Sequence, residues 1–136
     1  MELLISKEDV FNKLNIDLEA YLGVKGQPNN TTIVSEWLNE RQEEIADYIA
    51  QYAYFGREQA EAYFTCGRFT ESLKRAIICQ VKYVRDTGGL EIGGIMLGQG
   101  GATSKLSVDE RLENVVSPKS VRILENAGLL YTGRYM

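Results

Sequence analysis

Two long segments of this sequence repeat apolar side chains at helical spacing, and this repeat limits the fold more than any other feature. In the first segment, about residues 33–54, the apolar positions are Val34, Trp37, Leu38, Ile45, Tyr48, Ile49 and Tyr52. In the second, residues 70–86, they are Leu73, Ala76, Ile77, Val81 and Val84. Because this spacing collects apolar side chains on one face of an α-helix, the sequence predicts two amphipathic helices.

The outer faces of these two helices carry opposite charges. The first face holds Glu36, Glu40, Arg41, Glu43, Glu44 and Asp47, and the second holds Lys74, Arg75, Lys82 and Arg85. Antiparallel packing of the pair would bury both apolar faces and leave the charges in solvent. We therefore predict an all-α fold, a small helical bundle built on two long antiparallel helices.

Shorter helices are predicted on either side of this pair by their end signals. Ser6 and Asp9 have the spacing of a capping box, which places a first helix over about residues 7–14. Residues 17–23 form a short second helix between a capping aspartate and a glycine, and residues 57–64 form another turn or two. Thr32 is the expected cap of the long acidic helix, which Gly56 is expected to end.

The last helix is predicted to start at Ser117, because serine caps helices and the following proline tolerates the first helical position. It is expected to stop before Gly128, with Val121, Leu124 and Ala127 on its inner face.

The chain has the size and composition of one domain. It has 136 residues, 44% hydrophobic and 25% charged, and this length buries one core but not two. No apolar run approaches the roughly 20 residues that span a bilayer, and the first residues lack the pattern of a secretion signal. We expect a single domain over residues 1–136 that resides in the cytoplasm, with Cys66 and Cys79 reduced and partly buried.

Most catalytic chemistry is disfavoured by the residue types present. The chain has no histidine, which is the commonest general base and metal ligand. Its two cysteines do not have the paired spacing of a zinc site. Carboxylates that could bind magnesium do occur together, in Glu40, Glu43, Glu44 and Asp47, but an acidic face is what any amphipathic helix shows. We predict no catalytic residue, no metal and no cofactor.

Residues 88–104, GGLEIGGIMLGQGGATS, hold seven of the 13 glycines. Gly93 and Gly98 have the first spacing of a P-loop, but the required lysine does not follow, and Thr103 replaces the third glycine of a dinucleotide fingerprint. A glycine-rich loop or a short β-hairpin is the better prediction. Its apolar side chains would be costly to leave exposed, so we expect an assembly arm that becomes ordered against a neighbouring subunit. The residues of this arm are Leu90, Ile92, Ile95, Met96 and Leu97.

The chain closes with LLYTGRYM, predicted to be an extended tail over residues 129–136. Leucine can fill a groove, and tyrosine and arginine are enriched at interface hot spots. The candidate contact residues are Leu129, Leu130, Tyr131, Arg134 and Tyr135. The alternative is that the tail folds back and covers the core of its own bundle.

The order of these features resembles the head-tail connector, or adaptor, proteins of long-tailed bacteriophages and prophages. The resemblance rests on the helix LKRAIICQVKYVRDTGG, the glycine-rich stretch after it and the ending SPKSVRILENAGLLYTGRY. It implies a head-completion protein without enzyme activity that forms a ring, twelve-fold as a dodecamer, beneath the portal protein. Such a ring extends the DNA channel and meets the next neck or tail-completion protein.

By the same resemblance, the tail from Leu129 onward would hold the portal or a neighbouring subunit, and residues 88–104 would join ring or neck contacts. The protein would be found in the host cytoplasm during assembly and in the virion neck afterwards. DNA would pass through without specific binding, which is compatible with the net charge of −4, because tight wrapping of nucleic acid needs many phosphate-neutralising cations.

Two other functions remain open on the sequence. A helical DNA-binding or regulatory domain would use the basic face of residues 70–86, although a short helix-turn-helix spacing is missing. An enzyme would use a metal bound by the acidic cluster of the first long helix.

Overall fold

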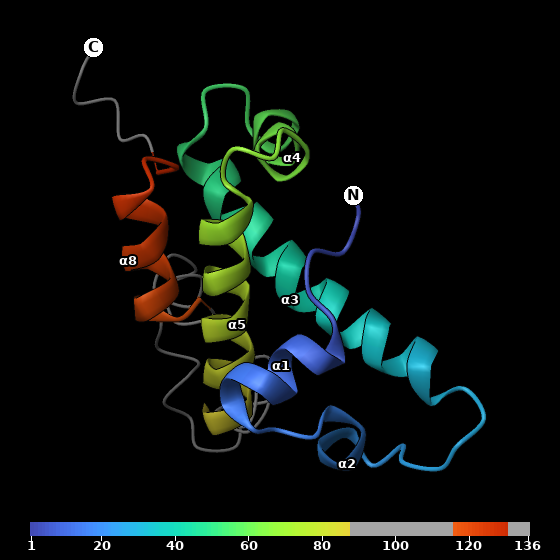
Figure 1. The fold of residues 1–136 in the computed structure, drawn as a ribbon. Helices are drawn as coiled ribbons and strands as arrows, with labels where there is room; N and C mark the ends of the chain where they lie inside the picture. Colours follow the sequence, from blue (N-terminus) through green and yellow to red (C-terminus); the bar gives the residue numbers. More distant parts are fainter. Residues whose placement is uncertain (88–115, 131–136) are drawn as a thin grey trace, which may run out of the picture.

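The computed structural model describes residues 1–87 and 116–130, and Figure 1 shows the helices that this part forms. They are α1 (Lys7–Leu14), α2 (Leu18–Leu22), α3 (Asn30–Tyr52), α4 (Arg57–Thr65), α5 (Thr70–Thr87) and α8 (Pro118–Asn126). These described residues contain no strand, so the all-α class is confirmed for them. The predicted hairpin or loop at 88–104, with its arm residues Leu90, Ile92, Ile95, Met96 and Leu97, lies outside the described residues.

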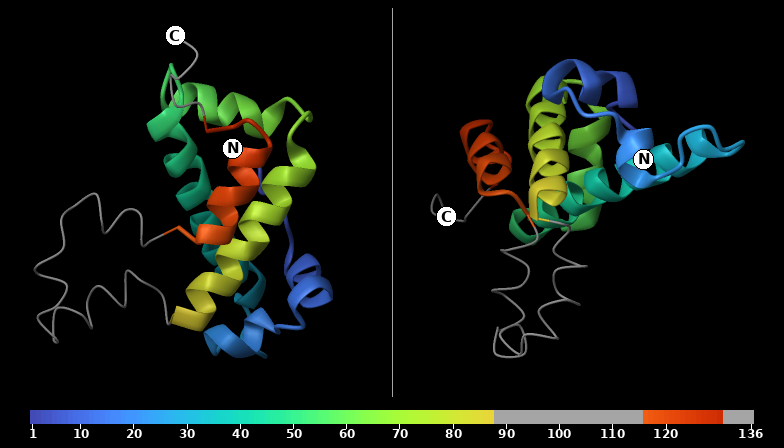
Figure 2. Two further views of the ribbon diagram at one scale, coloured as in Figure 1. Left: turned by 90° about the vertical axis from the view of Figure 1, so that its left-hand side faces the viewer. Right: turned by 90° about the horizontal axis from the view of Figure 1, so that it is seen from below.

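Helix α5 lies at the centre of the arrangement. Helix α8 packs along one side of α5, and α3 crosses its other side, as the views in Figures 1 and 2 agree. Helix α4 packs on α3, while α1 contacts both α5 and α2. Every described helix therefore shares one continuous core.

The apolar residues predicted to face inward do so. On α5 all five are buried, with at most 3% of their surface exposed. On α3, Val34, Leu38, Ile45, Tyr48 and Ile49 are buried, and Trp37 and Tyr52 are partly buried against the same core. Full burial of such a side chain stabilises the fold by about 1.5–3 kcal/mol, so this periodic pattern is the main reason that the sequence forms these helices.

Three predicted helix starts are confirmed in detail. Ser6 and Asp9 exchange the two hydrogen bonds of a capping box, and the Asp17 side chain accepts from the backbone N–H groups at the start of α2. Ser117 caps α8 by accepting from the backbone N–H of Ser120 at 3.4 Å, with Pro118 in the first turn. Each of these caps satisfies a backbone donor that the helix itself leaves unpaired.

The predicted cap at Thr32 is wrong, because α3 begins earlier. The backbone N–H of Asn30 already donates to the carbonyl of Gln27 at 3.2 Å, so the preceding turn runs directly into the helix. Asn29 takes the cap position without a side-chain hydrogen bond. The helix also ends at Tyr52 instead of Gly56, and Gly56 stands at the start of α4.

Arg41 was predicted on the solvated outer face of α3, and this is wrong as well, because its side chain is only 2% exposed. Its guanidinium lies 4.6 Å from the centre of the Trp37 ring and pairs with Glu40 and Glu44, each at 3.1 Å. The long stem lets the charge fold back over the preceding turn, where the aromatic ring and the carboxylates compensate the loss of water.

Gln42, the next residue along α3, is fully buried and holds the N-terminal segment. Its amide nitrogen donates to the carbonyl of Glu2 at 2.7 Å, and its oxygen accepts from the backbone N–H of Leu4 at 2.9 Å. These two hydrogen bonds fix the N-terminal segment against α3, because the Gln42 amide satisfies one backbone donor and one backbone acceptor of that segment.

Candidate assembly surface

Two adjacent aromatic side chains stand exposed in the turn between α3 and α4. Tyr54 is 76% exposed and Phe55 is 70% exposed, and their rings meet edge to face at 5.1 Å. The turn closes through the backbone N–H of Gly56, which donates to the carbonyl of Ala53 at 3.1 Å. Gly56 has a φ of 64°, a left-handed conformation that glycine adopts without strain. The backbone therefore holds both rings away from the core.

The end of the described chain lies at the same end of the molecule as this aromatic pair (Figures 1 and 2). After α8, Gly128 turns the chain with a φ of 81°, and the backbone N–H of Leu129 donates to the carbonyl of Leu124 at 3.0 Å. Leu129 is 1% exposed and belongs to the core, and Leu130 packs against that core while partly exposed. The base of the C-terminal segment is thus fixed to the bundle.

The predicted tail contacts consequently divide into two groups. Leu129 covers the core of its own bundle, which is the alternative interpretation for this residue, and a contact through it would first have to expose it. Leu130 keeps a partly exposed surface. Tyr131, Arg134 and Tyr135 lie outside the described residues.

A buried polar seam joins α8 to α5 and α3. The Gln80 side chain, fully buried on α5, accepts from the backbone N–H of Ser117 at 2.8 Å and donates to Glu44 at 2.9 Å. One turn along α8, the buried Ser120 hydroxyl donates to the carbonyl of Ala76 at 2.7 Å. These bonds specify where α8 sits on α5, because apolar contacts alone would tolerate sliding.

Basic side chains gather where α5 and α8 meet. Cys79 lies half-buried on α5, and burial raises the pKa of its thiol, although the nearby Lys119, Arg75 and Lys82 act in the opposite direction. Farther along α5, Lys82 and Arg85 both pair with Asp86. Cys66, in contrast, is exposed at the end of α4, so the prediction that it is partly buried is wrong.

Two arginines pair with four of the acidic residues on α3. Arg41 pairs with Glu40 and Glu44 on the helix itself, while Arg57 reaches across from α4 to Glu43 and Asp47. No group of three or more potential ligands is close enough to bind a metal ion within the part of the chain that the structure describes. Glu43 and Asp47 therefore tie α4 to α3, while Glu40 and Glu44 pair within α3.

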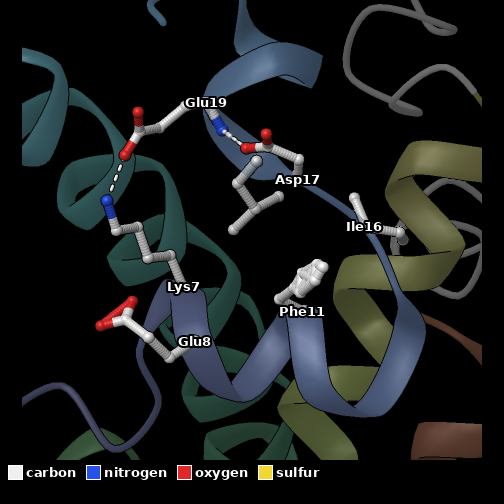
Figure 3. Close-up of a pocket in the computed structure, with 7 residues that line it drawn as sticks. Lys7, Glu8, Phe11, Ile16, Asp17 and Glu19 are labelled. Carbon is white, nitrogen blue, oxygen red and sulfur yellow. Dashed lines mark hydrogen bonds and ion pairs between the residues drawn. The ribbon is translucent and has the colours of Figure 1, made fainter.

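A hollow of about 280 Å³ lies between α1 and α2 (Figure 3). Lys7 crosses it to pair with Glu19, and this hydrogen bond raises the pKa of the lysine. Asp17, beside it, accepts from Lys25 and from the start of α2, which lowers the pKa of its carboxyl. Phe11 forms part of the lining and is 48% exposed. The ion pair of Lys7 and Glu19 therefore links α1 to α2 across this hollow.

Two surface residues, Tyr54 and Phe55, and one buried residue, Gln80, were not found by sequence reasoning. Tyr54 and Phe55 stand directly before a glycine, between the two helical patterns, and two neighbouring aromatics at such a turn are the signal that could have indicated exposure. Gln80 falls in the apolar phase of α5, three and four residues from Ile77 and Val84, and that position could have indicated a buried amide.

Comparisons with protein-family models, with curated proteins and with solved structures each find no match to this chain. Among the described helices, none combines the length and apolar character needed to cross a membrane.

Proposed function

We propose that this chain is a structural assembly protein of the head-tail connector type, acting without catalysis or cofactor. Copies form a ring beneath the portal protein, and the ring continues the DNA channel towards the next neck or tail-completion protein. Assembly takes place in the host cytoplasm, and the finished ring resides in the virion neck. In each subunit α3 and α5 form the antiparallel pair at the centre of the bundle.

The observation that carries the proposal is the exposed pair of Tyr54 and Phe55 in the turn between α3 and α4. In Figures 1 and 2 this turn lies at the same end of the molecule as the described chain end after α8. Large aromatic rings held in solvent by a short turn are costly for an isolated subunit, and such rings dominate binding energy at protein interfaces. The end of the molecule that carries this aromatic pair also carries the base of the C-terminal segment, which Leu129 fixes to the core. These two features together suit docking to the portal.

The buried position of Leu129 determines how the tail should be truncated. Removing residues 129–136 would delete a core side chain, so a loss of binding could come from unfolding. Deletion of residues 131–136 keeps Leu129 and Leu130 in place and tests the tail alone. We expect this shorter deletion to leave the helical circular dichroism unchanged and to abolish binding to portal rings.

The aromatic pair is tested by replacing Tyr54 and Phe55 with serine and measuring binding to portal rings. If each ring acts as a hot spot of about 2 kcal/mol, each substitution alone lowers the affinity about 30-fold, and the two together lower it further. Phe11→Ser, at another exposed aromatic position, is the matched control and should bind as wild type does. Portal binding that survives both the aromatic substitutions and the 131–136 deletion would contradict the proposal.

A further inference from the structure

Charge is divided between two sides of the molecule. Residues 1–52 carry ten acidic and four basic side chains, whereas α5 and α8 together carry six basic and three acidic ones. In Figures 1 and 2, α8 lies on one flank, the N-terminus and the start of α3 lie towards the opposite flank, and α5 runs between them. The part of the subunit that the structure describes therefore has one acidic and one basic side.

The acidic side contains an open hollow of about 630 Å³. Its walls are the N-terminal segment, with Met1 and Leu3, and the first half of α3, with Glu36 and Glu40. Both carboxylates are exposed, and the described residues include no ion-pair partner for Glu36. The rest of the lining is polar, from Thr31, Thr32, Ser35 and Asn39. A long basic side chain can lay its stem against Met1 and Leu3 and bring its charge to the two carboxylates.

The basic side is formed by α8 and the neighbouring part of α5. Lys119 and Arg122 are three residues apart, so they share one side of α8. Both are exposed, as is Arg75 on α5, and the structure gives none of the three an ion pair within the residues it describes. These cations are therefore available to a partner.

We propose that Lys119 and Arg122 of one copy bind in the acidic hollow of the next copy, in a head-to-tail contact. The occupant is a second copy of this chain because the two surfaces are complementary in charge and lie on opposite flanks. A contact between two different surfaces of identical subunits generates a closed ring when the rotation between neighbours closes. This inference rests on the proposed role as a ring subunit and specifies the surfaces that meet.

The first test uses self-association at two salt concentrations. A protein of net charge −4 should repel its own copies in dilute salt unless complementary sides attract. We expect sedimentation coefficients of the full chain to rise with concentration at about 20 mM salt and to stay constant at about 300 mM, where exposed charges are screened. Repulsion at the lower salt concentration would overturn the proposal.

The second test reverses the charge of each side separately and then of both sides in one chain. Lys119→Glu with Arg122→Glu, or Glu36→Lys with Glu40→Lys, should each weaken self-association at least about tenfold. All four changes in one chain restore the original net charge with the polarity inverted, so this variant should associate with itself and fail to join wild type. Glu36→Lys alone is a second acidic-side variant, because Glu40 also contacts the buried Arg41. If the quadruple variant, with all four substitutions, does not recover self-association, the inference is wrong.

The matched control is Lys13→Glu with Arg68→Glu, which changes the net charge equally at exposed positions outside both surfaces. It should associate as wild type does, and equal weakening would mean that net charge alone matters, against the proposal. Binding of a short DNA duplex that is lost in Lys119→Glu with Arg122→Glu, together with absent self-association, would instead assign the basic side to nucleic acid.

Portal binding distinguishes this inference from the proposed function. If the reversals leave self-association unchanged while Tyr54→Ser with Phe55→Ser abolishes portal binding, the head-to-tail contact is wrong and the connector role stands. If the quadruple variant recovers self-association and no form of the protein binds the portal, the head-to-tail contact is supported and the connector role fails.

Discussion

Replacement of the buried Gln80 by leucine tests whether the polar seam holds α8 in place. Leucine has nearly the volume of glutamine, so the change removes hydrogen bonds without opening a cavity. The backbone N–H of Ser117 loses its acceptor at 2.8 Å inside the core, and Glu44 loses a donor at 2.9 Å.

The expected cost follows from the burial of these two groups. An unsatisfied buried backbone donor costs about 1–3 kcal/mol. The loss at Glu44 is smaller, because that carboxylate is 18% exposed and keeps its contact with Arg41. Burial of the apolar leucine side chain offsets part of this loss. We expect a net decrease of about 2–3 kcal/mol in the free energy of unfolding. For a domain of this size the melting temperature should fall by about 6–12 °C.

The assay is urea unfolding followed by circular dichroism and by the fluorescence of the single tryptophan, Trp37. Gln51→Leu, the same chemical change at an exposed position of α3, is the control and should alter the free energy of unfolding by no more than about 0.5 kcal/mol. An unfolding free energy for Gln80→Leu equal to that of this control would refute the reasoning.

Three further predictions concern single side chains. Arg41→Met removes the partner of the partly buried Glu44 carboxylate, so the free energy of unfolding should fall by about 2–4 kcal/mol. The emission of Trp37 should also shift because the overlying guanidinium is gone, and unchanged emission would contradict this contact. Hydrogen bonds from Lys25 and from the start of α2 lower the pKa of Asp17 in the folded state, so its contribution to stability is present above the unfolded pKa and is lost as the pH falls through the folded pKa. The difference between wild type and Asp17→Asn in urea midpoint should therefore be full at pH 7 and shrink as the pH falls below the unfolded pKa, and a constant difference would oppose this. At pH 8 a thiol reagent should label the exposed Cys66 quickly and Cys79 slowly, because burial raises the pKa of the Cys79 thiol. Cys79→Ser reports the labelling rate of Cys66, and Cys66→Ser reports that of Cys79. Equal rates in the two variants would exclude this difference.

The helices could be predicted from the sequence because their signals are local. The inward residues of α3 and α5 follow from periodicity, and the caps at Ser6 and Ser117 follow from residue type. The error at Thr32 has a different origin, since a turn formed by earlier residues had already set the helix direction. Local sequence therefore identified the elements well and their boundaries less well.

The buried polar residues could not be placed from periodicity, because their partners lie far away in the sequence. Arg41 has the helical position of a surface residue, and only the ring of Trp37 and two carboxylates make its burial tolerable. Gln80 is buried by its phase on α5, but its hydrogen-bond partners come from α3 and from the start of α8. Pairings of this kind arise from tertiary packing.

The same seam connects stability with the proposed contact between copies. Ser117 and Ser120 fix α8 on α5, and this register sets the direction in which Lys119 presents its charge. Ser120→Ala removes the 2.7 Å hydrogen bond with little change in volume and should cost about 1 kcal/mol. If α8 must keep its register for copies to associate, the sedimentation assay at low salt should show weaker association for this variant, even where all of it is folded. Association equal to wild type would mean that the seam serves stability alone, and that apolar packing of α8 is enough to orient its basic side.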